Sequence, residues 1–216
     1  MKNSKNPPDV TAEQKILISA REIFHKKGFE GARMQEIADK AGINKALLHY
    51  YYRSKEKLFD AVFAEALKTL IPKVKELLDA ELPLFDKIKY FTDNYIKLLM
   101  ENMYLPVFVI YELFQNPEKI LSKFTEKSNF TPSVFIAQIR KSVKNKEIKK
   151  TDPRQLFINL MSLCIYPIIA KPLIMKIYDL NEQGFNRFIN QRKKEIPEFI
   201  INSIKINKNS SSNGKK

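Results

Sequence analysis

Residues able to carry metal or catalytic chemistry are sparse in this sequence. The chain has two histidines, His25 and His49, and one cysteine, Cys164, and the three do not cluster. A structural or catalytic zinc site needs three or four such ligands close together, so we expect no metal. Five glycines leave no room for a glycine-rich phosphate loop or a dinucleotide fingerprint, so we expect no cofactor.

An enzyme is also disfavoured. An all-α hydrolase or transferase using Glu112 or Asp93 with a nearby tyrosine is an alternative, but no residues supply a nucleophile with its base. Cys164 lies in an apolar run, which indicates an inert thiol, and it has no partner for a disulfide. The missing disulfide, together with polar residues 1–9 and no apolar segment behind them, predicts a cytoplasmic protein.

Composition narrows the class further. The chain has 216 residues, of which 44% are hydrophobic and 29% charged, so it is long enough to bury a core. No stretch of about 18 uncharged apolar residues exists, so we expect no membrane partner. The net charge of +14 is weak evidence for a polyanion partner, because most of the excess lies beyond residue 60 and is mainly lysine.

The elements that must position any functional side chains are helical. Helical periodicity runs almost throughout and no alternating strand pattern is visible, so we predict an all-α fold. Thr11 and Gln14 form a capping box for the first helix, and Gly28 supplies its stop. Pro72 is expected to interrupt its helix, and Pro167 and Pro197 to bend theirs. The predicted helices cover 12–27, 34–40, 45–51, 55 to beyond 63, 85–103, 106–115, 117–128, 132–146, 153–171 and 182–205.

The first 60 residues contain two short predicted helices joined by a tight turn. Ala41-Gly42-Ile43 forms the turn, and Asn44 caps the second short helix. Packed on a longer first helix, this pattern indicates a helix-turn-helix, whose second short helix enters the major groove of DNA. The alternative is an ordinary three-helix bundle that binds nothing.

A longer set of residues favours the DNA-binding interpretation. From Thr11 to Phe63 the sequence resembles the TetR/AcrR family of transcriptional regulators along that family's whole DNA-binding domain. Beyond these residues the resemblance covers only the number and order of helices. The resemblance is carried by the Ile16–Phe24 stripe, Gly28-Phe29-Glu30-Gly31, Ile37-Ala38, Ala41-Gly42-Ile43, Leu48 and Tyr51-Tyr52-Arg53-Ser54-Lys55-Glu56-Lys57-Leu58.

The resemblance implies a homodimer that binds a two-fold operator in double-stranded DNA. It also implies a ligand pocket in each C-terminal domain and, usually, repression relieved by a small molecule, here an apolar or aromatic one. We therefore expect a flexible arm over 1–10, a helix-turn-helix domain over 11–60, a larger helical ligand-binding and dimerisation domain over 61–206, and a disordered basic tail over 207–216.

The sequence departs from the family pattern at two places. Ala32 and Arg33 stand where the family often has Ser or Thr, whose hydroxyl caps the helix and contacts phosphate. Arg33 can replace the phosphate contact, but neither residue can replace the cap. Leu47 replaces a common Thr, and its apolar side chain can contact a thymine methyl. These departures motivate one further alternative, a helical interaction protein whose helix-turn-helix is degenerate and no longer binds DNA.

The predicted DNA contacts follow from the helix-turn-helix and the resemblance. Lys45, in the first turn of the recognition helix, can reach guanine or phosphate, while His49 and Tyr50 donate to phosphates. Lys55 is expected to anchor a phosphate at the start of the next helix. The full predicted set is Arg33, Gln35, Asn44, Lys45, Ala46, Leu47, His49, Tyr50, Ser54 and Lys55.

The C-terminal part is rich in aromatic residues at helical spacing. Such stripes are more often core than ligand site, and only the need for a cavity between the helices favours a pocket. The predicted pocket residues are Phe91, Tyr95, Phe108, Tyr111, Phe114, Phe135 and Asn159. The last two long helices carry wide apolar stripes and are the predicted dimer interface, through Phe157, Leu160, Cys164, Phe185, Phe188 and Phe199.

Overall fold

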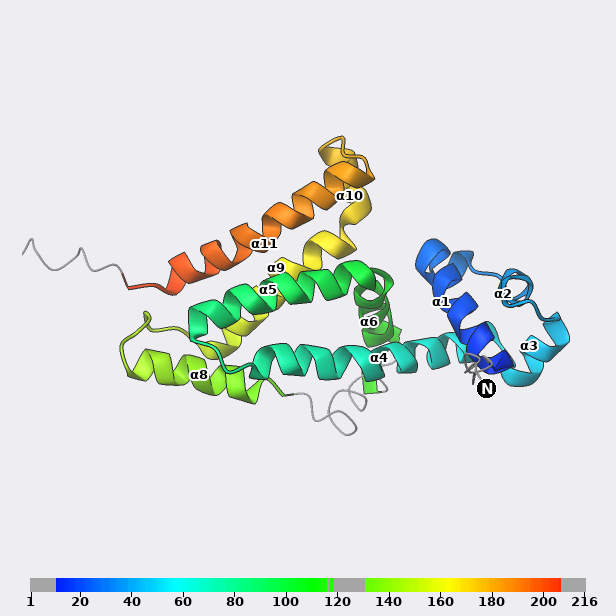
Figure 1. Cartoon of the computed structure of the whole chain (residues 1–216), viewed down its shortest axis with the longest axis horizontal. Helices are drawn as coiled ribbons and strands as arrows, with labels where there is room; N and C mark the ends of the chain where they lie inside the picture. The colour runs from blue at the N-terminus through cyan, green and yellow to red at the C-terminus, as the bar shows by residue number, and fades with distance from the viewer. Residues whose placement is uncertain (1–10, 116, 119–130, 207–216) are drawn as a thin grey trace, which may run out of the picture. The chain divides into compact units, whose positions relative to one another are not determined.

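The computed structural model describes residues 11–115, 117–118 and 131–206. Within these ranges the chain forms ten helices and no strand, with one isolated bridge between Ile148 and Lys205 (Figure 1). The all-α prediction is therefore confirmed. The predicted arm over 1–10, most of the predicted helix over 117–128 and the predicted tail over 207–216 lie outside the described residues.

The chain divides into two compact units. Unit 1 ends at Thr69 and unit 2 begins at Leu70. This boundary falls inside helix α4 (Lys55–Asp79), whereas the sequence suggested a boundary after residue 60. Helix α4 therefore contributes residues to both units.

Unit 1 contains α1 (Ala12–Gly31), α2 (Met34–Ala41), α3 (Lys45–Tyr51) and the first part of α4. The predicted capping box is present: the Gln14 amide donates to Oγ1 of Thr11 at 3.2 Å, and the Thr11 amide donates to the Gln14 side chain at 2.9 Å. Gly28 has a φ of 68°, and this left-handed residue ends the regular geometry of α1 as predicted. The core of unit 1 contains Ile16, Ala20, Phe24, Ile37, Ala38, Leu48, Leu58 and Phe63.

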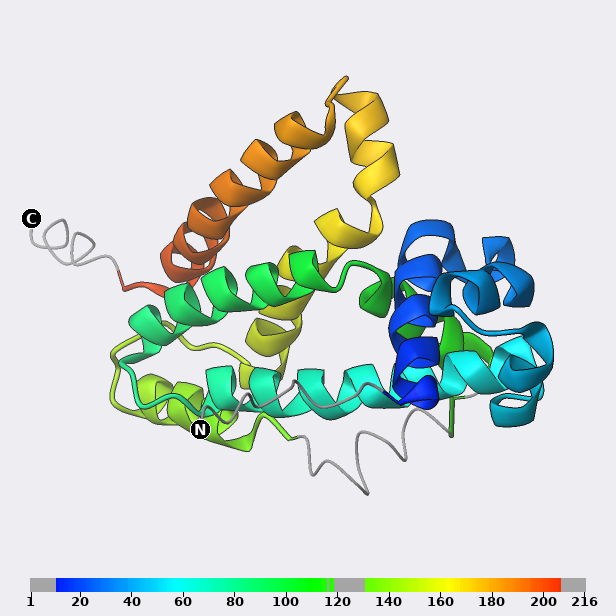
Figure 2. The same ribbon diagram turned by 45° about the vertical axis from the view of Figure 1, so that its right-hand side comes forward.

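Unit 2 is built around α5 (Leu84–Glu101). Helix α5 packs against α8 (Ser133–Lys144), α9 (Pro153–Ile169) and α11 (Glu182–Ile204), and α6 (Tyr104–Gln115) lies against α9 (Figure 2). Apolar residues three and four apart along α5 share one helical face, and that face is buried. Its buried members are Ile88, Phe91, Tyr95, Leu98 and Leu99.

The predicted interruption at Pro72 is wrong. Helix α4 continues through Pro72 to Asp79. An internal proline removes one backbone hydrogen bond and costs about 3 kcal/mol. Three apolar side chains after it, Val74, Leu77 and Leu78, are buried in the core of unit 2 and offset that loss.

A short helix, α10 (Lys171–Ile177), was not predicted. The sequence suggested one helix to residue 171, but α9 ends at Ile169, two residues after Pro167, and α10 follows at an angle of 70°. The bend expected at Pro167 thus takes the form of a helix break. Pro197 lies inside α11, which continues to Ile204.

Candidate nucleic-acid interface

The turn between α2 and α3 is fixed by its glycine. Gly42 adopts φ 68° and ψ 33°, a left-handed conformation that costs a residue with a Cβ roughly 1–2 kcal/mol. The Ile43 amide donates to the Ala38 carbonyl at 3.1 Å, and the Gly42 amide donates to the Asp39 carbonyl at 3.1 Å. These two bonds satisfy carbonyls at the end of α2, so the chain reverses within three residues.

Helix α3 begins at a side-chain cap and shows one polar face. Oδ1 of Asn44 accepts the Leu47 amide at 2.7 Å, as the cap prediction required. Leu48 is fully buried and holds the helix on the core. The opposite side of α3 is exposed at Lys45, Ala46, His49 and Tyr50.

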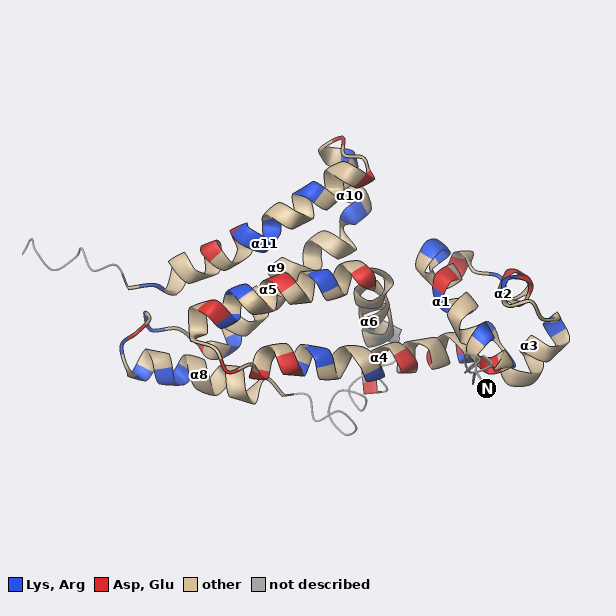
Figure 3. Cartoon of the chain, in the orientation of Figure 1, with Lys and Arg blue, Asp and Glu red and all other residues tan. Residues whose placement is uncertain are grey.

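This exposed face has the size and chemistry to enter a major groove. It presents an ammonium in the first helical turn, a small methyl beside it, and an imidazole and a phenol one turn later. Tyr50 is 81% exposed, and its ring packs edge-on against Tyr51 at 5.6 Å between centroids. Helix α3 carries no acidic side chain that would repel phosphate, and Figure 3 shows a basic segment at its start.

Tyr51 and Tyr52 have different surroundings. Tyr52 is buried, and its hydroxyl donates to Oε1 of Glu13 on α1 at 3.1 Å. Burial, reinforced by this carboxylate, raises the pKa of the Tyr52 phenol. Tyr52 is therefore a core residue, and it joins the end of α3 to α1.

The beginning of α2 lacks a side-chain cap. Arg33 occupies the N-cap position with extended backbone angles and makes no cap hydrogen bond. Its guanidinium is exposed, as a phosphate contact requires. Gln35 is also exposed, and its amide donates to Asp39 at 2.8 Å. Leu47 on α3 is half-buried, so only part of its apolar side chain is available to contact a thymine methyl.

The start of α4 shows a contact that the sequence did not predict. Oγ of Ser54 accepts the Lys57 amide at 3.3 Å and caps the helix as expected. Lys55, predicted as a phosphate anchor, donates from Nζ to the Phe29 carbonyl at 3.0 Å and lies 4.3 Å from the Phe29 ring centroid; its role toward phosphate stays a prediction. Its ammonium therefore ties α4 to the end of α1, a contact across 26 residues of sequence that has no local signal.

Arg53 is a residue that the sequence reasoning missed. It lies between α3 and the Ser54 cap, its side chain is exposed, and its carbonyl is 3.3 Å from Nδ1 of His49. An arginine directly before a helix cap, next to the recognition helix, is the signal that would have added this exposed cation to the predicted set.

The predicted pocket residues do not come together as one set. Phe91, Tyr95, Phe108 and Phe135 are buried in unit 2, whereas Phe114 is 84% exposed, and Tyr111 and Asn159 are also exposed. The buried residues of α6 among those described are Leu105, Pro106 and Phe108, all in its first half, whereas Tyr111 and Phe114 near its end are exposed. The structure therefore removes Tyr111, Phe114 and Asn159 from the buried set.

The predicted interface residues divide in the same way. Leu160, Cys164 and Phe185 are almost fully buried in the core of unit 2, so they are not available to a partner subunit. Phe157 and Phe188 are half-buried, and Phe199 is 68% exposed. The exposed apolar side chains of α9, α10 and α11 are Ile158, Tyr166, Leu173, Ile177 and Phe199, which we call the α9–α11 apolar surface.

Cys164 provides a direct check of this correction. Burial raises the pKa of its thiol to about 12, so the native chain holds very little thiolate, the reactive form, at pH 8. We expect no measurable reaction with Ellman's reagent in the folded protein and full reaction in guanidinium. Ser162, exposed on α9, gives the matched control: the variant Cys164→Ala with Ser162→Cys should react while folded. Rapid labelling of native Cys164 would contradict the burial.

A metal centre and a single membrane-spanning helix are both missing among residues 11–115, 117–118 and 131–206. No group of three His, Cys, Asp or Glu side chains is arranged to hold a metal ion there. In the same ranges no single helix is long and apolar enough to cross a bilayer; α9 and α10 reach that length and composition only as a pair, bent by 70°.

Comparisons with known proteins agree with this geometry. Residues 16–62 match the family model for bacterial regulatory proteins of the tetR family. The uncharacterized HTH-type transcriptional regulator YhgD of Bacillus subtilis is 23% identical over 69% of this chain and 78% of its own length. The HTH-type transcriptional activator FasR of Mycolicibacterium smegmatis is 34% identical over 42% of this chain, which spans only 46% of FasR.

A solved structure extends the likeness to the rest of the fold. The transcriptional regulator FadR of Bacillus subtilis, in complex with stearoyl-CoA, aligns with a TM-score of 0.56 at 17% identity. The alignment covers 84% of this chain and 96% of FadR. At this identity the comparison shows a shared fold.

Proposed function

Because this chain belongs to the TetR family of bacterial transcriptional regulators, we propose that it is a ligand-responsive repressor that releases its operator when a largely apolar small molecule binds unit 2. The relatives are transcriptional regulators and not enzymes, which supports a regulatory rather than a catalytic role. A repressor acts on the chromosome, and we propose the cytoplasm as its location.

The exposed face of α3 carries the DNA-binding proposal. Gly42 and Asn44 fix the direction of α3, and the buried Leu48 holds it so that Lys45, His49 and Tyr50 point outward. A degenerate helix-turn-helix would be expected to lose the turn, the cap or the polar face, and all three are present. The interaction-protein alternative is therefore the weaker one, despite the missing cap at Arg33.

Homodimerisation belongs to the same proposal. A two-fold dimer presents two α3 helices to two half-sites, about 34–36 Å apart or a multiple of that distance. The α9–α11 apolar surface is the part of unit 2 that we assign to the partner subunit, because unit 2 leaves these large apolar side chains exposed.

The effector class rests on unit 2. Its core contains Phe91, Tyr95, Phe108 and Phe135, and a cavity opened among these side chains would be lined by apolar and aromatic groups. FadR, with the same fold, holds stearoyl-CoA, whose acyl chain is a ligand of that character. Helix α4 contributes residues to both units, so a ligand that shifts its second half has a direct route to the first.

The test begins with the full-length chain and a library of random DNA duplexes. We expect selection to enrich a two-fold sequence, and a bound small molecule to weaken its binding. About 100-fold weaker binding requires about 2.7 kcal/mol of preference for the DNA-free form. Long-chain acyl-CoA, a free fatty acid and an aromatic hydrocarbon are the first effectors to compare.

Failure at each stage has a distinct meaning. A library from which no sequence is enriched would refute DNA-specific regulation and favour the interaction protein. Enrichment of a two-fold site with expression rising when the regulator is present would replace repression by activation, the role that FasR carries in its name.

A further inference from the structure

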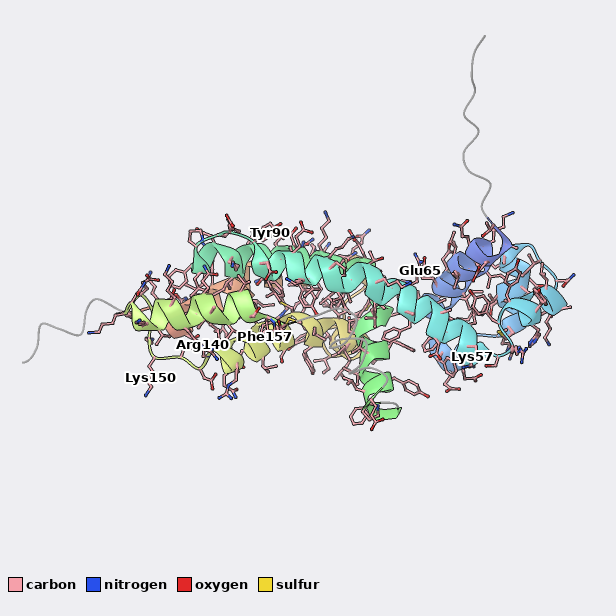
Figure 4. All side chains as sticks on the ribbon, turned by 90° about the horizontal axis from the view of Figure 1, so that it is seen from below. Lys57, Glu65, Tyr90, Arg140, Lys150 and Phe157 are labelled. Carbon is pink, nitrogen blue, oxygen red and sulfur yellow. The ribbon has the colours of Figure 1, made fainter. Side chains whose placement is uncertain are left out.

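The end of α8 and the loop after it form a dense patch of positive charge. Residues 140–150 hold six cations and a single acid, Glu147, and all six cationic side chains are exposed. Figure 3 shows these basic segments gathered along α8 and the following loop, and Figure 4 shows Arg140 and Lys150 at the same end of unit 2. We call Arg140, Lys141, Lys144, Lys146, Lys149 and Lys150 the α8 basic surface.

Some lysines elsewhere in the chain make ion pairs, and among the described residues the cations of the α8 basic surface do not. Lys27 pairs with Glu36, Lys40 with Glu22 and Lys171 with Glu182, each at 2.7 Å. Among the described residues, no cation of the α8 basic surface makes an ion pair; the one side-chain contact is Nζ of Lys149 donating to the Ser203 carbonyl at 3.3 Å. Clustered like charges repel one another, and a polyanion would relieve that repulsion.

The acids nearby in sequence are already engaged. The carboxylate of Glu147 accepts hydrogen bonds from Oγ of Ser142 at 2.8 Å and from the side-chain amide of Asn145 at 3.0 Å. These hydrogen bonds lower the pKa of Glu147, so it stays ionised, but they hold it against its own loop. Asp152 is held by Arg154 at 2.8 Å.

The loop that carries the cations is fixed to the rest of unit 2. Ile148 is buried and forms the isolated antiparallel bridge with Lys205, and the Lys149 amide donates to the Ile204 carbonyl at 2.8 Å. The backbone amide of Asn145 donates to the Lys141 carbonyl at 2.9 Å at the end of α8. A fixed backbone loses less freedom on binding than a basic tail does.

The chemistry of the patch selects the kind of polyanion. Ile148 is buried and Val143 is half-buried, so no exposed apolar side chain in 140–150 can insert into a bilayer. The segment has no aromatic residue on which an unpaired base could stack. Flexible lysine ammonium groups, five of the six cations, match the closely spaced phosphates of a duplex without reading its bases.

We propose that the α8 basic surface is a second DNA-binding surface, which holds the phosphate backbone of duplex DNA without sequence preference. It is separate from α3 and lies in the other unit. The occupant is a segment of duplex DNA of any sequence. The α8 basic surface should contribute to non-specific DNA affinity whether or not α3 recognises an operator.

The test compares two full-length variants of equal charge. The first changes Arg140, Lys141, Lys144 and Lys150 to glutamine; the control changes Lys73, Lys97, Lys176 and Lys194, which are exposed lysines of unit 2 outside the patch. Both lose four positive charges. The probe is a 30-base-pair duplex of arbitrary sequence, measured by fluorescence anisotropy between about 50 and 300 mM NaCl, where each lost phosphate contact lowers the salt slope by about 0.9.

We expect the patch variant to lose a salt slope of about two to four and at least about tenfold in affinity at 50 mM salt, with the control within about twofold of the parent. Equal losses in both variants would reduce the effect to net charge and overturn the proposal. Binding of the parent to phosphatidylserine vesicles that the patch variant alone loses, with duplex binding unchanged, would assign the surface to lipid instead. Loss of operator selectivity in a Lys45 variant leaves this result untouched, so the two proposals fail separately.

Discussion

Replacing Lys45 by alanine should lower the affinity of the dimer for its operator by at least roughly 30-fold. Lys45 is exposed in the first turn of α3, where an ammonium reaches guanine O6 and N7, and a good base contact is worth about 1–3 kcal/mol. Two copies of the contact are lost in the dimer. The measurement is equilibrium binding to the selected duplex and to duplexes carrying each single base change in a half-site.

The base changes separate the two roles that Lys45 can have. If it reads a base, Lys45→Ala should relax the preference at one position in each half-site; if it holds only phosphate, affinity should fall uniformly and the salt slope should drop by about one per subunit. Lys68→Ala is the matched control, because Lys68 is exposed on α4 in the same unit and distant in sequence from α3. Unchanged affinity in Lys45→Ala, or an equal loss in Lys68→Ala, would refute the assignment of α3 as the reading helix.

The helix-turn-helix could be predicted from sequence because short-range interactions fix it. Thr11 and Gln14 bond each other, Gly42 supplies a left-handed turn, and Asn44 caps the helix that follows it. Each signal acts within three or four residues, which is the range over which sequence patterns are readable. Lys55 shows the limit, since its partner is a carbonyl 26 residues away.

The faces of α9 could not be assigned in the same way. Leu156, Leu160 and Cys164 lie four residues apart and are buried, while Ile158, on the other side of the same helix, is 55% exposed. Polar residues on α9 are few and apolar residues lie on several of its sides, so the sequence gives only a weak periodicity from which to identify the inner side. Which side of α9 is buried depends on where α5 and α11 pack against it, and the tertiary fold sets that position.

This assignment of faces leads to the second large effect. The double variant Ile158→Glu with Phe199→Glu should convert the dimer to monomers, because it places two charges per subunit in the α9–α11 apolar surface. Both side chains are exposed in the single chain, at 55% and 68%, so the substitutions should leave the fold of each subunit intact. Sedimentation velocity gives the mass, and circular dichroism verifies the helix content.

Loss of the dimer should carry a much larger cost in DNA binding than either charge would directly. A dimer binds its second half-site as an intramolecular step, which raises affinity by about 10²–10⁴-fold over one head alone. We therefore expect the monomeric variant to lose operator binding by that factor while a single half-site binds as weakly as before. Val134→Glu, which charges a 45% exposed side chain on α8, is the control and should remain a dimer with full affinity. A stable dimer in the double variant would move the interface away from α9 and α11, and monomers that keep full operator affinity would show that one reading head is sufficient.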